Sequence, residues 1–162
     1  MKTNNIVTFQ IGSQLFALSS SDVAEILPLP ALSAPSPLPG VIAGFIDLGK
    51  DVASVLKLDR LLDIDGAPPN LYSHLLRLSD ANGKLALLVD RVLAVRPVSS
   101  SDMRPIAGEE TFRGCVLAQF SDGDRPVHLL SPKALLSNFE RDRIQSFHDA
   151  EARRRAEFEE RA

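Results

Sequence analysis

The feature that most constrains the fold is an order of short strand-like segments that occurs once in each half of the chain. Four matched pairs keep the same order: FQIGSQLFAL with LRLSDANGKLALL, VAEILP with VLAVRP, GFIDL with GCVLA, and VLKLDRLL with LLSPKALL. The offset between the copies rises slowly from the first pair, Phe9 and Leu76, to the last, Leu62 and Leu136. Small loop insertions produce such a drift. The pattern indicates two copies of one β unit, each too small to bury a core well alone.

Turn signals separate the strand-like segments within each copy. Residues 5–11 alternate between two faces, the pair GS follows, and residues 14–18 return. In the second copy, Asn82-Gly83 is a favoured tight-turn pair between two apolar runs. Short strands with turn signals about every 8 to 12 residues are typical of small barrels. The sequence therefore predicts an all-β fold of two linked small five-stranded, SH3-like β-barrels with short connecting helical turns and a charged C-terminal α-helix.

The connections divide one expected domain, residues 1–162, into parts. The proline-rich stretch 28–40 excludes regular helix, because proline lacks an N–H group and biases the preceding residue toward extended geometry. DIDGAPPN, residues 63–70, is the strongest linker signal. The expected parts are a first barrel half at 5–62, a second at 71–136 and the C-terminal helix at 137–162. Short helical turns are expected at 19–27, 58–62 and 132–136.

The last segment predicts a charged helix. Of the 24 residues from Phe139 to Ala162, seven are acidic and six are arginine. Ile144 and Phe147 are three residues apart, which predicts that they dock the first turns on the β domain. Beyond about Ala150 we expect the helix to stand in water or to meet a partner.

Composition excludes several classes of function. The net charge of -3 gives no general attraction to nucleic acid or anionic lipid. No signal peptide and no run of about 18 apolar residues is present, so we expect a cytoplasmic protein without direct membrane insertion. The single cysteine, Cys115, excludes an intramolecular disulfide and a cysteine-based zinc site. Its apolar neighbours predict a buried, unreactive thiol.

No combination of residues predicts catalysis. His74, His128 and His148 are isolated from one another and from metal-ligand spacing. The adjacent Glu109 and Glu110 lie in a Gly-flanked loop, where solvated carboxylates are expected instead of an acid/base pair in a cleft. We therefore expect no enzyme activity, no cofactor and no metal. A two-lobed β protein without such chemistry most often binds other proteins, through an exposed apolar groove between its lobes.

Four motifs in a fixed order carry a resemblance to a known family. IVTFQIGSQLFALSSSDVAEILPLP has a strand, a Gly turn, a V-x-E-I turn and a proline connection, and Pro39 to Leu48 reads P-x-x-x-x-G-F-I-D-L. LLVDRVLAV and VHLLSPKALL follow at residues 87–95 and 127–136. Together these motifs resemble the CheW-like domain family of chemotaxis coupling proteins, in order over residues 5–136. The resemblance implies two linked five-stranded barrels that bridge the cytoplasmic tips of chemoreceptors (methyl-accepting proteins) to the regulatory domain of a CheA-type histidine kinase.

The resemblance also implies a set of contact residues. In such proteins the V-x-E-I turn, the G-x-x-N-L-R-G segment and valines between the lobes contribute to the contacts. Core packing is the alternative role for the valines and the isoleucine, whereas a buried glutamate would need partners. The candidate partner-binding residues are Val23, Glu25, Ile26, Gly44, Asp47, Gly49, Lys50, Lys57, Val89, Asp90 and Val92.

Four candidate residues depart from the family pattern. Asp47, Gly49 and Lys50 stand where the family has Asn, Arg and Gly, and Lys57 stands where Asp is usual. Loss of the Arg removes a planar five-donor group suited to a carboxylate, and Lys for Asp inverts a charge. The chain is therefore an adaptor that links receptors to the kinase, or a divergent member that has lost standard kinase coupling and modulates or caps the array or serves another signalling pathway.

A third alternative belongs to a different class: a small β-barrel ligand-binding protein or enzyme. A deep polar pocket with converging titratable groups would favour this alternative over the adaptor.

Overall fold

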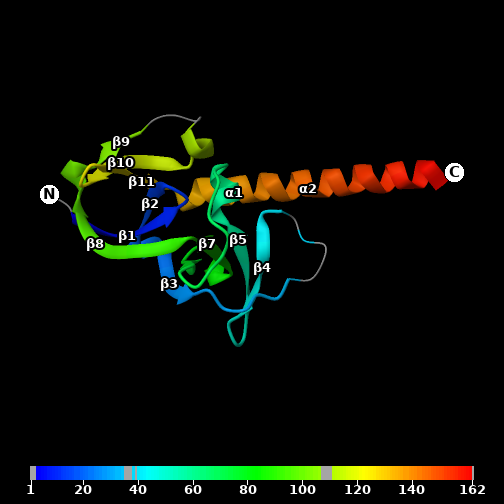
Figure 1. Cartoon of the computed structure of the whole chain (residues 1–162), viewed down its shortest axis with the longest axis horizontal. Helices are drawn as coiled ribbons and strands as arrows, with labels where there is room; N and C mark the ends of the chain where they lie inside the picture. The colour runs from blue at the N-terminus through cyan, green and yellow to red at the C-terminus, as the bar shows by residue number, and fades with distance from the viewer. Residues whose placement is uncertain (1–2, 35–37, 39, 107–110, 162) are drawn as a thin grey trace.

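The computed structural model describes residues 3–34, 38, 40–106 and 111–161, and consists of two β-sheets and a long C-terminal helix (Figure 1). Pro39, Glu109 and Glu110 lie outside the described residues. The helices are α1 (Leu58–Leu62) and α2 (Pro132–Arg161). The strands are β1 (Thr3–Ile11), β2 (Gln14–Ser19), β3 (Val23–Pro28), β4 (Ile42–Asp47), β5 (Val52–Lys57), β6 (His74–Leu78), β7 (Leu85–Val89), β8 (Arg91–Ser99), β9 (Arg104–Pro105), β10 (Val116–Asp122) and β11 (Arg125–Leu130).

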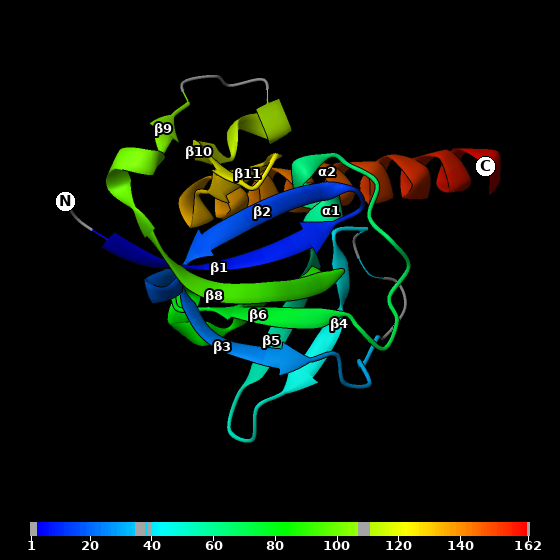
Figure 2. The same cartoon turned by 60° about the vertical axis from the view of Figure 1, so that its left-hand side comes forward.

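The two sheets do not follow the two halves of the sequence. The first sheet has the order β8-β1-β2-β11-β10-β9 and the second has the order β3-β6-β7-β5-β4. Hairpin β1–β2 thus lies among strands of the second half, and hairpin β6–β7 among strands of the first half (Figure 2). The predicted division into barrel halves at 5–62 and 71–136 is therefore corrected: each half places its first hairpin in the other sheet. Each exchanged hairpin is joined to strands of the other half by a parallel pair, β2 with β11 in the first sheet and β7 with β5 in the second.

Closed barrels are not confirmed. Within the described residues neither ladder closes, since the first sheet ends at β8 and β9 and the second at β3 and β4. Ser33, in the connection that follows β3, forms an isolated bridge to Phe45 of β4, with N···O distances of 3.1 and 2.8 Å. The coarser prediction is confirmed: the chain is mostly β, with two sheets and a C-terminal helix.

The internal repeat is present in the pairing register of the sheets. The register shift next to Val23 in β3 recurs in β8 next to Val92, the residue that the sequence match pairs with Val23. The shift just before Gly44 in β4 recurs in β10 just before Ala118. Gly44 therefore corresponds to Ala118, and the sequence match to Gly114 was wrong.

Two predicted helical turns differ from the structure. Ser19 ends strand β2, Ser20–Asp22 forms a single 3-10 turn, and residues 23–27 belong to strand β3, which pairs with β6. The Ser and Asp residues do begin a helical turn, but the turn ends at Asp22. Val23 is β-branched, which favours a strand, and β3 begins there and pairs with β6. The predicted turn at 132–136 continues without a break into the charged helix as α2, whereas α1 matches the turn expected at 58–62.

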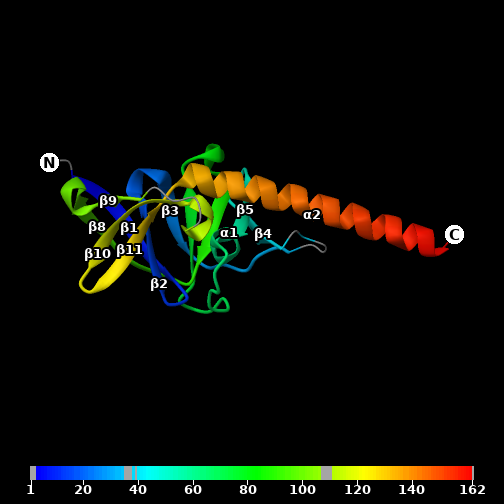
Figure 3. The same cartoon turned by 90° about the horizontal axis from the view of Figure 1, so that it is seen from above.

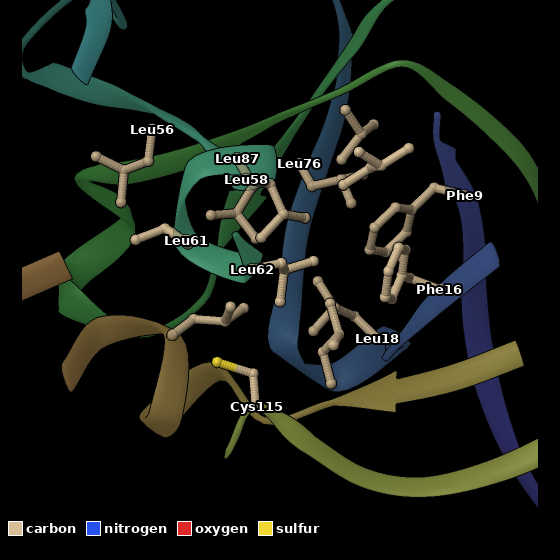
Figure 4. Close-up of a cluster of buried hydrophobic side chains, with 14 of the residues drawn as sticks. Phe9, Phe16, Leu18, Leu56, Leu58, Leu61, Leu62, Leu76, Leu87 and Cys115 are labelled. Carbon is tan, nitrogen blue, oxygen red and sulfur yellow. The ribbon is translucent and has the colours of Figure 1, made fainter. Parts of the chain in front are cut away.

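A central core joins the two sheets. Leu15 and Ala17 of β2 belong to a core inside the first sheet, whereas the alternate residues Phe16 and Leu18 belong to the central core. Strand β2 is consequently buried on both faces. Figure 4 shows the leucines of α1 among side chains from both sheets.

Among the described residues, the buried side chains of α2 lie in its first turns. Leu135 and Phe139 are buried, at 1% and 8% exposed. Ile144 and Phe147, predicted to dock the helix, are 56% and 68% exposed, so that prediction is wrong. Figures 1 and 3 show the remainder of α2 leaving the body as a straight extension.

Polar groups make the rest of the attachment of α2. The Asn138 amide nitrogen donates to the carbonyl oxygens of Leu61 and Arg113, both at 3.3 Å, and to Cys115 Sγ at 3.1 Å. Arg113 and Asp142 form two parallel hydrogen bonds of 2.9 Å. Bidentate guanidinium–carboxylate pairs hold a defined geometry, so they fix the direction in which α2 departs.

Candidate functional site

A hollow of about 630 Å³ lies between the two end strands of the second sheet. Because β3 and β4 line the same hollow from opposite ends of the strand order, the sheet is strongly curled. We call this region the β3–β4 hollow. Its lining includes Glu25, Pro28, Asp47, Leu48, Arg77 and Gly83.

An ion pair lies in the β3–β4 hollow. Glu25 Oε2 is 3.2 Å from Arg77 Nη2 and 3.3 Å from Arg77 Nε. The two side chains are 46% and 24% exposed, so Arg77 is the more enclosed partner. A Cβ atom on Gly83 would lie 2.3 Å from Arg77 Nη1, and Gly83 has φ +71°. The guanidinium therefore packs directly against Gly83, and Glu25 has the partner that the sequence could not identify.

The tip of the β4–β5 hairpin is a closed turn. Asp47 Oδ1 accepts a hydrogen bond from the Gly49 backbone nitrogen at 2.8 Å, and the Leu48 nitrogen donates to the Asp51 carbonyl at 2.8 Å. Gly49 has φ +97°, and no heavy atom lies within 4 Å of the position that a Cβ atom would take. The tip has room for a side chain, but its backbone conformation disfavours one. Lys50 is exposed beside it.

Gly44, in the same hairpin, allows close packing of the backbone. A Cβ atom there would lie 2.8 Å from the Ser33 carbonyl oxygen and 3.0 Å from Leu32 Cβ. The glycine thus allows the connection after β3 to approach β4. It lies in the same strand as Asp47, but it is buried and presents no side chain to a partner.

Three candidate residues lie apart from the β3–β4 hollow. Lys57, Val89 and Asp90 line a second hollow of about 300 Å³. Asp90 Oδ2 accepts hydrogen bonds from the backbone nitrogens of Gly12, at 2.7 Å, and Ala67, at 3.0 Å. This carboxylate therefore fastens the linker to the β1–β2 turn. Val89 is 1% exposed and packs in the central core.

The remaining candidates lie along β3 and β8. Val23 and Val92 are half-buried against the central core, as the alternative role of core packing implied. Ile26 is 37% exposed. Sequence reasoning missed Leu93 and Val95 on β8, which are 43% and 57% exposed. The signal available in the sequence was the alternation along β8, in which Leu93 and Val95 lie two residues apart and therefore on the same face of an end strand.

Arg77 was also missed. It is a single charge within the apolar strand segment HLLRL, and such a charge in a half-buried strand needs a partner. That argument could have paired it with a carboxylate on a neighbouring strand, but it could not have chosen Glu25 without the topology.

The contacts of His128 and His74 are with core side chains and backbone groups. His128 packs between the rings of Phe16, at 6.0 Å, and Phe112, at 5.0 Å, and burial lowers its pKa. His74 Nδ1 accepts a hydrogen bond from the Val92 nitrogen at 3.3 Å. Within the described residues, no group of three or more His, Cys, Asp or Glu side chains is placed to hold a metal ion.

Comparisons with known proteins identify the family. The family model of the CheW-like domain matches residues 5–140. The chain belongs to the CheW-like domain family. Among solved structures, the scaffolding protein TtCheW from Thermoanaerobacter tengcongensis is similar, with a TM-score of 0.74 and 21% sequence identity over 83% of this chain and 88% of that chain. At this identity the likeness shows the fold alone. No curated protein matches the chain.

The predicted family is thereby confirmed for this CheW-like protein. The match ends at residue 140, so most of α2 extends beyond the family domain. In the part of the chain that the structure describes, no helix combines the length and the apolar character needed to cross a membrane.

Proposed function

We propose that this CheW-like protein is a non-catalytic adaptor of a bacterial chemosensory array. It links the cytoplasmic tips of chemoreceptors to the regulatory domain of a CheA-type histidine kinase and acts in the cytoplasm. The observation that carries the proposal is the match of the CheW-like domain over residues 5–140. The similar solved structure, TtCheW, is described as a scaffolding protein, which agrees with this role.

The β3–β4 hollow is the surface that we assign to one of the partners. It combines the Glu25–Arg77 pair with apolar side chains, including Leu27 and Leu48. Docking of a partner would remove water from a charge pair that is now partly exposed, and charge complementarity across such a surface sets partner choice. The ion pair already orients the Arg77 guanidinium toward Glu25, which reduces the ordering cost of binding.

A second candidate function is a CheW-like protein that no longer couples the kinase in the standard way and instead modulates or caps the array or serves another pathway. The hairpin tip favours it. Gly49 supplies no guanidinium, and its φ of +97° disfavours any side chain. Lys57, the other charge departure, lies at the second hollow and not at the tip. The hairpin tip thus carries charges that differ from the family pattern, while the fold of the family is retained.

A two-arm binding experiment tests the proposal. A soluble chemoreceptor tip fragment and an isolated kinase regulatory domain, both from the same cell as this chain, are titrated separately with the full-length protein. We expect both arms to bind, and Arg77→Ala to weaken one of them by about tenfold or more, since charged anchors dominate many interfaces. Arg104→Ala, on exposed β9, is the matched control and should change neither arm.

The outcomes separate the candidates. Binding in the receptor arm alone supports the second candidate, and binding in neither arm contradicts the adaptor. Gly49→Arg should bind the kinase more tightly than Gly49→Ala if the tip still faces the kinase. The two substitutions share the backbone strain, so the comparison isolates the guanidinium group. Equal kinase binding by both would show that this surface no longer contacts the kinase.

A further inference from the structure

The part of α2 that leaves the body carries an apolar stripe. Ile144, Phe147 and Phe158 are 56%, 68% and 75% exposed. At about 100° per residue they lie on one face of the helix, together with Glu151 and Arg154. Successive spacings of three and four residues along 144, 147, 151, 154 and 158 match the a and d positions of a coiled coil. Asn138 and Asp142, which contact the body, lie on the opposite side by the same geometry.

We propose that this stripe pairs with the same stripe of a second copy of the chain, as an antiparallel two-helix coiled coil. A two-fold axis between residues 152 and 153 aligns the core positions from 147 to 158 at once. It sets Phe147 against Phe158 of the second copy, and Glu151 against Arg154 of the second copy. Each pair occurs twice, as an isologous interface requires.

The charges select the antiparallel orientation. A parallel pairing in register would place Glu151 against Glu151 and Arg154 against Arg154 of the second copy at adjacent core layers. Like charges in such positions are repulsive. Within one chain Glu151 already forms an ion pair with Arg154 and lies 3.8 Å from Arg155, so these side chains reach across the helix surface. In the antiparallel pairing, each Glu151 lies at the same level along the helix axis as Arg154 of the second copy, so the facing charges are opposite.

The geometry leaves room for both bodies. The hydrogen bonds described between α2 and the body reach Asp142, and the helix continues to Arg161, so about 28 Å of helix lies beyond them. In the antiparallel arrangement the two bodies lie at opposite ends of the helix pair. Phe147 lies at the border of a hollow that Ser146, Asp149, Ala150 and Arg153 line together with Leu38 and Gly40 of the body, and its side chain is still 68% exposed.

The family match ends at residue 140, so the pairing element lies beyond the CheW-like domain and the inference does not rest on the proposed function. Pairing of two copies would give a protein with two CheW-like bodies, and therefore with two copies of each binding surface. Two bodies held at a fixed separation would bind two array partners with a gain in avidity that neither body has alone.

Sedimentation velocity on the full-length protein tests the pairing. We expect a monomer–dimer equilibrium that depends on concentration. Glu151→Arg and Arg154→Glu should each raise the apparent dissociation constant about tenfold or more, because each places like charges at both central layers. An equimolar mixture of the two variants should restore the dimer, since every central pair is then complementary. Arg153→Glu changes one charge on the same turn outside the stripe and should dimerise like the wild type.

Cysteine cross-linking tests the orientation. Under mild oxidation, a mixture of Phe147→Cys and Phe158→Cys proteins should form a mixed disulfide, whereas each variant alone should not link to itself. Cys115 is buried and does not compete. A wild-type protein that stays monomeric at every concentration would overturn the proposal. Failure of the charge mixture to restore the dimer, or efficient linking of either cysteine variant to itself, would overturn the antiparallel register.

Discussion

Asn138→Ala should weaken the protein more than any exposed substitution on α2. Asn138 is 1% exposed, and its amide nitrogen satisfies the carbonyl oxygens of Leu61 at the end of α1 and Arg113 in the Thr111–Gly114 turn. Its carbonyl oxygen accepts from Arg141 at 2.6 Å. One side chain thus joins α2 to two other segments of the fold.

The expected loss follows from those contacts. A buried carbonyl left without its donor costs about 1–3 kcal/mol, and the Arg141 group can turn to water because it is exposed. Loss of buried side-chain volume adds to this cost. We therefore expect a loss of about 3 kcal/mol in the free energy of unfolding. For a chain of this size that corresponds to a fall in melting temperature of about 6–12 °C.

Urea unfolding followed by circular dichroism measures the change. Gln145→Ala is the matched control, because Gln145 lies on the same helix and hydrogen-bonds only to exposed Asp149 among the contacts described. That variant should stay within about 0.5 kcal/mol of the wild type. An Asn138→Ala protein as stable as the Gln145→Ala protein would refute the role of Asn138 in holding α2.

Three further predictions concern the body and the helix. Gly44→Ala should lower the free energy of unfolding by about 1–3 kcal/mol, because its Cβ would lie 2.8 Å from the Ser33 carbonyl oxygen, and an unchanged urea midpoint would contradict that packing. Removal of residues 150–162 should change the stability of the monomer by less than about 0.5 kcal/mol, since those described side chains are exposed; a large drop in melting temperature would show that they pack. Burial raises the pKa of Cys115 to about 11, so iodoacetamide should label it only after unfolding. Because the folded thiol keeps a proton that the unfolded thiol loses near pH 9.0, stability should fall as the pH rises from 9 toward 11, and a Cys115→Ala protein should lack that part of the pH dependence.

Local patterns in the sequence were sufficient for most strands and for the presence of the repeat, but not for strand β3 or for the match of Gly44 within the repeat. The β4–β5 hairpin, the α1 turn and the position of Val23 relative to Val92 all follow from alternation and turn residues. The exchange of hairpins between sheets could not follow, because β1–β2 and β6–β7 present the same alternating pattern to either sheet. Only the packing of the complete chain distinguishes the two arrangements.

The attachment of α2 was mispredicted for a related reason. Apolar spacing pointed to Ile144 and Phe147, but the buried apolar residues of α2 are Leu135 and Phe139. Polar Asn138 and Asp142 add hydrogen bonds to carbonyl oxygens and to Arg113. Hydrophobic periodicity carries no information about such groups.

The grouping of the candidate site residues could not be predicted from the sequence. Resemblance supplied Glu25 and Asp47, and the structure brings them to one hollow. Arg77 joins them from the neighbouring strand β6 through a pairing register that no local pattern encodes. Val89 and Asp90 follow the same motif but hold the fold, which shows that motif membership does not separate contact from support.

Coupling of receptors to a kinase is the function proposed for this chain. The most direct measurement is co-sedimentation with membranes that contain chemoreceptors from the same cell, with and without the CheA-type kinase, scoring each partner in the pellet. We expect the protein to sediment with receptors alone and to increase the amount of kinase in the pellet. If the protein remains in the supernatant under both conditions and the amount of sedimented kinase does not change, the adaptor function is contradicted.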